Sequence, residues 1–537
     1  MKTPIIRIGN IQSYLKNVDK STLITIGSKM KFNKPYKIIS KVSKFRKLFF
    51  MSPKSFFNQK TGAFKTGLLP IVSSHLKDLN IGYQHLDERE PLPQLFENWN
   101  KTIHNNNNNF NINDDINDND NQENDDDDDD EIQLQPKMID SDFLSDVDVI
   151  LHDYQVDSVN FALSNHRGII KCATGGGKTL ILAAFIKALG SDVPVVILVS
   201  KRSLVTQIYN VLKELNICKA GRVSSDFLEV GMVTISTVRS THKIPEQVKN
   251  CRALIVDEVH EFSGPFSQKV FQQFENAYCR LGFSATPFKQ DDPVHNHYLT
   301  SVFGTLLCDI TTKELTKINI LSEAVIHFYP IKRPVVKVEP GSHFQIMENL
   351  LISENKYLND SIVKIIENIE SGRVMILVKR LSHGDELFKL LPNAYWIKGD
   401  DDQQTREHVI KKLRESDPNK KVIAIFSSIG NVGLDVKIHH LINACGGKDP
   451  NMTIQKLGRG LRRADDKTHL DYHDFNFSYK VNKALNDHSK ARINTLKNEG
   501  HQVILEEELI PLPNDGSKRK RKSSKKIISN NSLEEVD

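Results

Sequence analysis

Three glycines followed by a lysine and a threonine, Gly175 to Thr179, have the composition of a loop that binds phosphate. An apolar run at 168–170 leads into the loop and predicts a short buried strand, and residues 180–186 leave it with helical spacing. At such a strand-to-helix turn, backbone N–H groups and the positive end of the helix dipole attract anions. A glycine-rich turn with a steric purpose alone is the alternative for this stretch in isolation.

The loop predicts a site for the phosphates of a nucleotide. We expect Lys178 to reach the β- and γ-phosphates and the Thr179 hydroxyl to be a ligand of Mg²⁺. Cys172 stands where Gly or Ala is usual at the start of this pattern, and its side chain is small enough for that place. The residues expected to surround the phosphates are Thr174, Gly175, Gly176, Gly177, Lys178 and Thr179.

Two adjacent carboxylates follow a later apolar segment. Residues 193–199, 233–236 and 253–256 predict buried strands, and the last of them ends in Asp257-Glu258-Val259-His260. Ligands of open α/β sheets bind at the C-terminal ends of the strands. We therefore expect Asp257 to hold Mg²⁺ and Glu258 to orient and deprotonate an attacking water molecule.

A second α/β segment from about residue 325 to 485 has no phosphate loop of its own. Its predicted buried strands are 373–378 and 421–426. The segment also carries Gly433-Leu-Asp435 and the run Gln455 to Arg462. On a helix, Arg459 and Arg462 would share one face at i, i+3 spacing. Arginines donated to the charge that develops on a γ-phosphate are a known catalytic device, and a surface ion-pair face is the alternative.

The charge of the chain is unevenly distributed. Residues 1–60 carry fourteen Lys or Arg and one acid, Asp19, whereas residues 105–131 carry twelve Asp or Glu and no base. The basic stretch has Lys41, Lys44, Arg46 and Lys47 among Phe45, Phe49 and Phe50, which could track a phosphate backbone, with the phenylalanines in the core as the alternative. Residues 104–136 predict a disordered spacer, and Lys518 to Lys526 predict a nuclear address or a nucleic-acid tether.

Composition excludes several classes of protein. No run of 18 apolar residues predicts a membrane span, and the N-terminus lacks the apolar core of a signal peptide. Six cysteines lie far apart without a C-x-x-C pair, which indicates a reducing compartment and neither a disulfide framework nor a zinc site. We expect an intracellular location, with the nucleus or a viral replication compartment or virion as possibilities.

The motifs together form an ordered set over about 145–465 that resembles superfamily 2 helicases and translocases. Leu151 to Gln155 resembles the adenine-reading segment, and Gly433 to Asp435 and Gln455 to Arg462 resemble motifs V and VI. Segments 199–204, 234–237 and 280–287 resemble motifs that contact the nucleic-acid strand or couple hydrolysis to its movement. Through this resemblance, the residues implied to contact nucleic acid are Arg202, Thr237, Ser284 and Thr286.

Within the superfamily, D-E-V-H and Q-K-L-G-R-G-L-R-R resemble the UvsW-like and XPB-like branch. The segment Phe57 to Pro70 is similar to part of the N-terminal domain of phage UvsW-like helicases. The Arg-Glu-Asp motif of XPB-like enzymes is absent, which favours the UvsW-like side, and Arg239 stands where Gln is frequent in the branch.

The resemblance implies an α/β protein with two tandem RecA-like domains built on parallel sheets, plus a small N-terminal α+β domain. The expected parts are a basic accessory domain at 1–103, a linker at 104–140, an ATP-binding domain at 141–322, a C-terminal helicase domain at 323–485 and a basic tail at 486–537.

The resemblance also implies ATP-driven translocation on nucleic acid by a monomer, with ATP and Mg²⁺ as cofactors and DNA favoured over RNA. Catalysis would rest on Glu258, Asp257, Gln455, Arg459 and Arg462, with Gln155, Gly433 and Asp435 also at the nucleotide. The alternatives are an RNA helicase, a double-stranded DNA translocase that does not unwind, and a restriction-type translocase. The last is disfavoured because residues 1–100 lack an acidic pair followed by E-x-K. A non-enzymatic nucleic-acid-binding protein would be expected to have lost Lys178, Glu258 or Arg459, and all three are present.

Overall fold

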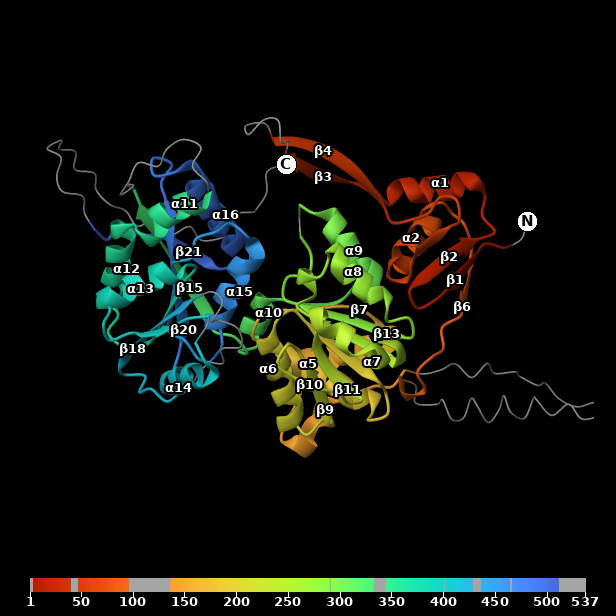
Figure 1. The fold of residues 1–537 in the computed structure, drawn as a ribbon, viewed down its shortest axis with the longest axis horizontal. Helices are drawn as coiled ribbons and strands as arrows, with labels where there is room; N and C mark the ends of the chain where they lie inside the picture. The colour runs from red at the N-terminus through yellow and green to blue at the C-terminus, as the bar shows by residue number, and fades with distance from the viewer. Residues whose placement is uncertain are drawn as a thin grey trace, which may run out of the picture. The chain divides into compact units, whose positions relative to one another are not determined.

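The computed structural model describes residues 3–39, 47–95, 136–289, 291–332, 344–399, 401–427, 436–463 and 466–510. The chain forms two compact units, Met1–Cys172 with Gly177–Asp309, and Ala173–Gly176 with Ile310–Asp537 (Figure 1). The acidic segment through residue 135, the basic residues 41–46, Gly433, Asp435 and the Lys-rich tail from 511 lie outside the described residues.

The first unit begins with a small α+β module, as expected. Its four strands pair in the order β5-β2-β1-β6, and the hairpin β3–β4 extends from it (Figure 1). The strand β2 alternates exposed and buried residues, so Ser13 and Leu15 face a core that includes Phe57 and Phe64. The elements are β1 Ile5–Ile8, β2 Gln12–Lys16, α1 Lys20–Lys29, β3 Lys31–Ile39, β4 Lys47–Ser55, β5 Ala63–Lys65, a 3₁₀ helix η1 Thr66–Leu68, α2 Leu69–Asp78 and β6 Gln84–Asp87.

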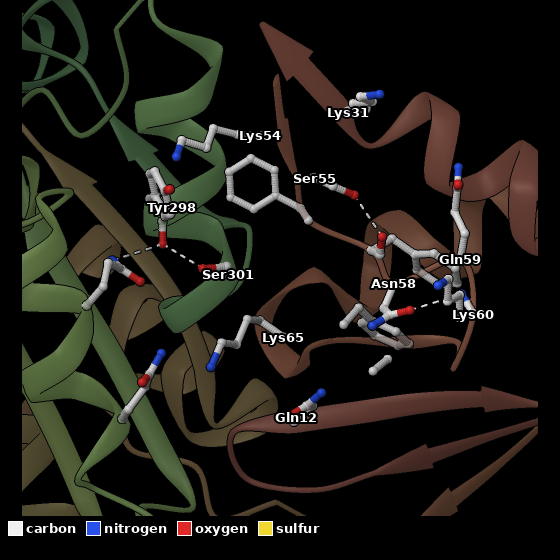
Figure 2. A pocket seen from close by; sticks show the side chains of 16 residues that line it. Gln12, Lys31, Lys54, Ser55, Asn58, Gln59, Lys60, Lys65, Tyr298 and Ser301 are labelled. Carbon is white, nitrogen blue, oxygen red and sulfur yellow. Dashed lines mark hydrogen bonds between the residues drawn. The ribbon is translucent and has the colours of Figure 1, made fainter. Parts of the chain in front are cut away.

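The module packs directly on the helix α9, Pro293–Phe303, of the same unit. A Cβ atom at Gly67 would lie 2.1 Å from the carbonyl oxygen of Thr300, so the backbones meet closely there. The rings of Phe56 and Tyr298 also meet edge to face, with centroids 5.1 Å apart. Figure 2 shows this junction, with Ser55 on one side and Tyr298 on the other.

The rest of the first unit is built on an eight-stranded sheet in the order β10-β9-β11-β8-β12-β13-β7-β14. The six consecutive strands from β9 to β7 in this order pair in parallel with one another, whereas β10 pairs antiparallel with β9. Every residue of β8 is buried, as a sheet covered on both faces requires. The strands are β7 Arg167–Cys172, β8 Val195–Val199, β9 Ala220–Val223, β10 Leu228–Glu229, β11 Val233–Thr237, β12 Ala253–Asp257, β13 Cys279–Ser284 and β14 Leu306–Ile310.

The four strands predicted for this sheet are present as β7, β8, β11 and β12. β8 begins at Val195 and not at Val193, since Pro194 has no N–H to donate to the neighbouring strand. The helices of this unit are α4 Asp153–Asn165, α5 Lys178–Leu189, α6 Arg202–Glu214, α7 Pro245–Asn250, α8 Pro265–Gln272 and α9.

The second unit contains a seven-stranded sheet in the order β17-β18-β16-β19-β20-β15-β21, with every neighbouring pair parallel. The predicted strands are present as β16 and β18. The strands are β15 Glu323–Ile331, β16 Gly372–Val378, β17 Tyr395–Ile397, β18 Lys421–Ser427, β19 His440–Asn443, β20 His469–Phe477 and β21 Gln502–Leu505. The helices are α10 Thr312–Lys317, α11 Phe344–Glu348, α12 Lys356–Asn368, α13 Leu381–Leu390, α14 Gln403–Arg414, α15 Pro450–Gly460 and α16 Lys483–Asn498.

This sheet corrects the expected start of the tail at residue 486. Helix α16 runs on to Asn498, and β21 then pairs in parallel with β15. Leu485, Ile493 and Leu496 are buried on α16, so this segment belongs to the folded second unit and not to a solvated tail. Across the described residues, no helix combines the length and apolar character needed to cross a membrane.

Candidate nucleotide-binding site

The phosphate loop forms the predicted turn between β7 and α5. Gly175 and Gly177 have φ angles of +90° and +80°, a left-handed conformation that residues with a side chain rarely adopt. Gly177 is the N-cap of α5, so Lys178 and Thr179 begin the helix and the loop leads directly into its N-terminus. Backbone amides and the helix dipole therefore favour an anion in front of this turn.

Gln155, which the resemblance assigns to the adenine-reading segment, lies against the phosphate loop. A Cβ atom at Gly177 would lie 2.4 Å from Gln155 Nε2, so a side chain at this position would force the amide to move. Gln155 is buried, and its Oε1 accepts a hydrogen bond of 3.0 Å from the His152 N–H at the start of α4. This capping interaction fixes the amide against the loop.

The acidic pair lies at the C-terminal end of β12, within reach of Lys178. Lys178 Nζ is 3.9 Å from Glu258 Oε1, and Asp257 Oδ1 accepts a hydrogen bond of 2.9 Å from the Glu258 N–H. Burial raises the pKa of Asp257, and the negative charge of Glu258 raises it further, while Lys178 opposes both. A cation beside Asp257 would therefore be strongly favoured.

The donors at this site suit Mg²⁺, which prefers oxygen ligands and usually keeps few protein ligands beside phosphate oxygens. Thr179 supplies a hydroxyl at the start of α5, and Asp257 supplies a carboxylate. Among the described residues, no group of three or more His, Cys, Asp or Glu is placed to hold a metal ion. The hydroxyl and the carboxylate are oxygen donors of the kind that bind Mg²⁺ beside phosphate oxygens.

Helix α15 of the second unit carries Gln455 and Arg459, but not Arg462. The helix ends at Gly460, and Arg462 forms an isolated antiparallel bridge with Leu321. Ser322, which follows Leu321 in the chain, donates its N–H to the carbonyl oxygen of Leu461 at 2.7 Å. The prediction that Arg459 and Arg462 share a helical face is therefore wrong, because backbone pairing with residues 321–322 ends the helix.

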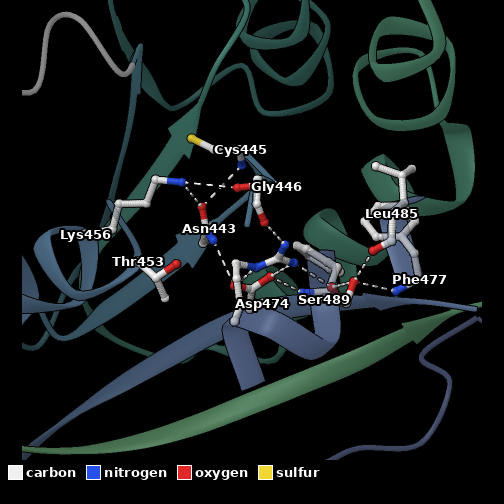
Figure 3. Close-up of polar contacts among 12 residues, drawn as sticks. Asn443, Cys445, Gly446, Thr453, Lys456, Asp474, Phe477, Leu485 and Ser489 are labelled. Atoms are coloured by element: carbon white, nitrogen blue, oxygen red, sulfur yellow. Dashed lines mark hydrogen bonds and ion pairs between the residues drawn. The ribbon is translucent and has the colours of Figure 1, made fainter. Parts of the chain in front are cut away.

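A buried polar network, which sequence reasoning missed, holds α15 against the sheet of the second unit (Figure 3). Lys456 Nζ on α15 donates to Asn443 Oδ1 at 3.1 Å, and Asn443 Nδ2 donates to Asp474 Oδ2 at 2.8 Å. Arg492 on α16 then donates to both oxygens of Asp474. These bonds join α15, β19, β20 and α16, so they orient the helix that carries Gln455 and Arg459.

Two family models match the chain. Residues 148–289 match the type III restriction enzyme res subunit, and residues 357–464 match the helicase conserved C-terminal domain. The ATP-dependent DNA helicase uvsW of Enterobacteria phage T4 is 26% identical over 341 residues, which are 59% of this chain and 66% of the phage protein. The two matched segments follow one another in the order that the resemblance to superfamily 2 helicases predicts.

The relatives confirm the predicted UvsW-like and XPB-like branch of these helicases. The DNA 3'-5' translocase XPB2 of Sulfurisphaera tokodaii is 22% identical over 363 residues, which are 60% of this chain and 80% of that protein. The matched region spans just under two thirds of the length of the phage relative. The crystal structure of T4 UvsW has a TM-score of 0.39 at 16% identity over 95% of this chain and 100% of its own, a likeness too low to carry an argument.

The histidine of D-E-V-H connects the acidic pair to the S-A-T segment. His260 Nδ1 lies 3.3 Å from Glu258 Oε2 and 2.8 Å from Ser284 Oγ, and Ser284 Oγ accepts a hydrogen bond of 3.1 Å from the Thr286 N–H. The sequence alone assigns His260 no role. Its position three residues after Asp257 was the available signal, but its partner lies on another strand.

The four residues expected to contact nucleic acid differ in exposure. Arg202 is exposed on α6 and pairs with Asp226 at 2.8 Å. Thr237, Ser284 and Thr286 are buried, and Ser284 has no exposed surface. Direct contact between the Ser284 hydroxyl and nucleic acid is therefore not supported, because Ser284 is buried at the end of β13. Its hydroxyl already bonds His260 and the Thr286 backbone.

Proposed function

We propose that this chain is an ATP-dependent DNA helicase or translocase that uses ATP hydrolysis to unwind or branch-migrate DNA. The observation that carries the proposal is the meeting of Lys178, at the N-terminus of α5, with Glu258 at the end of β12. A cation for the γ-phosphate and a base for water thus converge at a turn built for anions. The two helicase domain matches and the uvsW relative support the same reaction.

Each residue of the site has a part in the proposed hydrolysis. The loop amides and Lys178 bind and orient the phosphates, while Glu258 accepts the proton of the attacking water. Mg²⁺, held by Thr179 and Asp257 with the nucleotide, would neutralise phosphate charge. Gln155 would recognise the adenine. The proposal also includes contacts of Gln455, Arg459 and Arg462 with the γ-phosphate. Gln455 and Arg459 lie on α15, and Arg462 follows it.

The proposal also gives His260 a part in linking hydrolysis to movement on DNA. His260 contacts both the proposed base Glu258 and Ser284, whose hydroxyl holds the backbone of Thr286. A change in the charge of Glu258 during hydrolysis would therefore reach the S-A-T segment through one imidazole. DNA held mainly by its phosphates would be bound with little sequence preference.

The test is ATP hydrolysis by Lys178→Ala with forked DNA, duplex DNA and duplex RNA as activators. We expect the variant to lose hydrolysis stimulated by DNA while it still binds DNA, because the lysine contacts phosphate and not the strand. Lys213→Ala, which removes an exposed lysine of α6, is the matched control and should hydrolyse ATP at the wild-type rate. Wild-type turnover in Lys178→Ala would refute the proposed site, and stimulation by RNA alone would assign the substrate to RNA.

A further inference from the structure

A cavity of about 690 Å³ lies at the junction between the N-terminal module and the helices α8 and α9 of the first unit (Figure 2). Its walls come from the end of β4, the turn that follows it, β5 and the two helices. No residue of the phosphate loop or of the acidic pair lines it. The cavity is therefore separate from the proposed nucleotide site.

Contacts within the first unit hold the two walls of this cavity together. The backbone of Gly67 lies against Thr300 on α9, and Arg167 Nη2 donates to the carbonyl oxygen of Asn10 at 2.6 Å. Arg252 Nη1 also pairs with Glu90 Oε2 at 2.9 Å. One close backbone contact and two bonds made by arginine side chains therefore join the module to the rest of the unit, so the cavity lies between parts that contact one another directly.

The lining of the cavity is strongly basic. Four lysines line it, Lys31, Lys54, Lys60 and Lys65, and its described lining residues include neither Asp nor Glu. Figure 2 shows Lys54 and Lys65 on the side of the cavity that faces Tyr298 and Ser301. Burial lowers the pKa of Lys65, and the nearby positive charge of Arg280 lowers it further. Positive charge gathered in a concave site without a neutralising carboxylate favours an anionic ligand.

The remaining lining supplies groups that recognise a nucleobase. Phe56 and Tyr298 provide aromatic surface, and the amides of Gln12 and Gln272 can donate to and accept from a base edge. The volume lies within the range of about 300–1,000 Å³ that small-molecule sites occupy, and a base pair with both its strands is much larger. Lysines for phosphate, amides for a base edge and rings for stacking together match one unpaired nucleotide.

We propose that this cavity, the Lys54–Lys65 pocket, binds one unpaired nucleotide of a DNA strand, as found at a fork or a strand end, through its phosphate and its base. The inference rests on the proposed function, because it assigns the pocket to the DNA on which the enzyme acts. This assignment gives the junction between the N-terminal module and α9 a role, because together they would form a second DNA-binding site on the first unit. The enzyme would therefore prefer DNA with unpaired nucleotides over a continuous duplex.

The experiment measures binding of the full-length protein to a labelled fork and to a fully paired duplex of equal length, without ATP, by fluorescence anisotropy. The pocket variant is Lys54→Gln with Lys65→Gln. The matched control is Lys213→Gln with Lys249→Gln, which removes two exposed lysines of the same unit outside the pocket. Lys54→Glu alone, at an exposed position, serves as a second pocket variant that cannot disturb the core.

We expect the wild-type and control proteins to bind the fork about tenfold or more tightly than the duplex, and the pocket variants to lose this preference. The salt slope for the fork should fall by about 0.7 in the double variant, since the pocket holds one phosphate and each single-strand phosphate contact contributes about 0.7. Equal losses for fork and duplex, or equal losses in the control, would overturn the inference.

Two further measurements identify the source of the ligand and separate this inference from the proposed function. Deoxyadenosine monophosphate should compete with the fork for the wild-type protein. A strand-binding role would be overturned if the pocket variants lost binding of this mononucleotide but kept the fork affinity of the wild type. Maximal DNA-stimulated ATP hydrolysis should be the same in the pocket variants and the wild type. If the wild type hydrolyses ATP without stimulation by any DNA, the proposed function fails; if stimulation is normal and the fork preference survives in the variants, only the pocket inference fails.

Discussion

Arg492 donates two hydrogen bonds to the carboxylate of Asp474, from Nε to Oδ2 at 3.0 Å and from Nη2 to Oδ1 at 2.8 Å. Both side chains are almost fully buried, and the pair ties α16 to the strand β20. Burial disfavours the charge of Arg492, yet the adjacent Asp474 holds its pKa above the ordinary value. A fork-shaped pair in this position links the segment after residue 482 to the sheet that orients α15.

Removal of one charge from this pair is predicted to destabilise the second unit. Asp474→Asn leaves the Arg492 guanidinium buried without its counter-charge, which costs about 3–5 kcal/mol in comparable pairs. Unfolding in urea is followed by the fluorescence of Trp396, which lies on β17, in a background in which Trp99 is replaced by Phe. Glu415→Gln, which breaks the exposed pair with Lys411, should change stability by less than about 1 kcal/mol. A similar small loss in Asp474→Asn would refute the prediction.

Gly177→Ala is predicted to weaken nucleotide binding by more than the backbone strain of an alanine in a left-handed conformation would explain. An alanine at φ +80° costs about 1–2 kcal/mol, and its Cβ would also lie 2.4 Å from Gln155 Nε2. Gly190→Ala is the matched control, because Gly190 has φ +86° at the other end of α5 and no atom within 4 Å of an added Cβ. Binding of a fluorescent ATP analogue should fall at least tenfold in Gly177→Ala and less than about twofold in Gly190→Ala.

The Gln155 contact can be isolated with a second substitution. Gln155→Ala in the Gly177→Ala background removes the steric conflict, so part of the lost affinity should return even though adenine recognition is lost. Double-mutant analysis of the four proteins measures this interaction directly. Strict additivity of the two substitutions would show that Gln155 does not press on the loop.

The second unit is predicted to lose stability as the pH falls below about 6.5. Burial and the positive charges of His327 and His440 together lower the pKa of His473 to about 3. The unfolded chain therefore binds more protons than the folded one between pH 6.5 and 3, so stability is fully present above the unfolded pKa and declines toward acid. His327 acts in the opposite sense, because carboxylates of Asp471 and Glu506 overcome its burial and raise its pKa.

Urea midpoints measured at several pH values between 4.5 and 7.5 test this assignment. His473→Gln should reduce the decline, which for one such group is at most about 1.4 kcal/mol per pH unit. Tyr329, whose hydroxyl lies 3.2 Å from His473 Nδ1, remains in place to pack against the glutamine. An unchanged decline in the variant would assign the acid sensitivity to other groups.

The local chemistry of the site could be predicted because its parts are contiguous in the chain. The glycine turn, Lys178 and Thr179 follow one another, and Asp257 and Glu258 end a strand whose apolar run marks its burial. The apolar runs likewise predicted the central strands β8, β12, β16 and β18, since strands covered on both faces must be apolar throughout. The order of the motifs then indicated the family.

Other features depended on contacts between distant parts of the chain, which no local pattern records. Backbone pairing with Leu321 places Arg462 outside the helix. His260 bonds the buried hydroxyl of Ser284, which lies on the distant strand β13. The segment that resembles the start of a basic tail packs as α16, where Arg492 bonds the buried carboxylate of Asp474. The lysines of the pocket become one site only where the module meets α9. Periodicity and composition set which residues are buried and charged, but the pairing of buried polar groups is a property of three-dimensional packing alone.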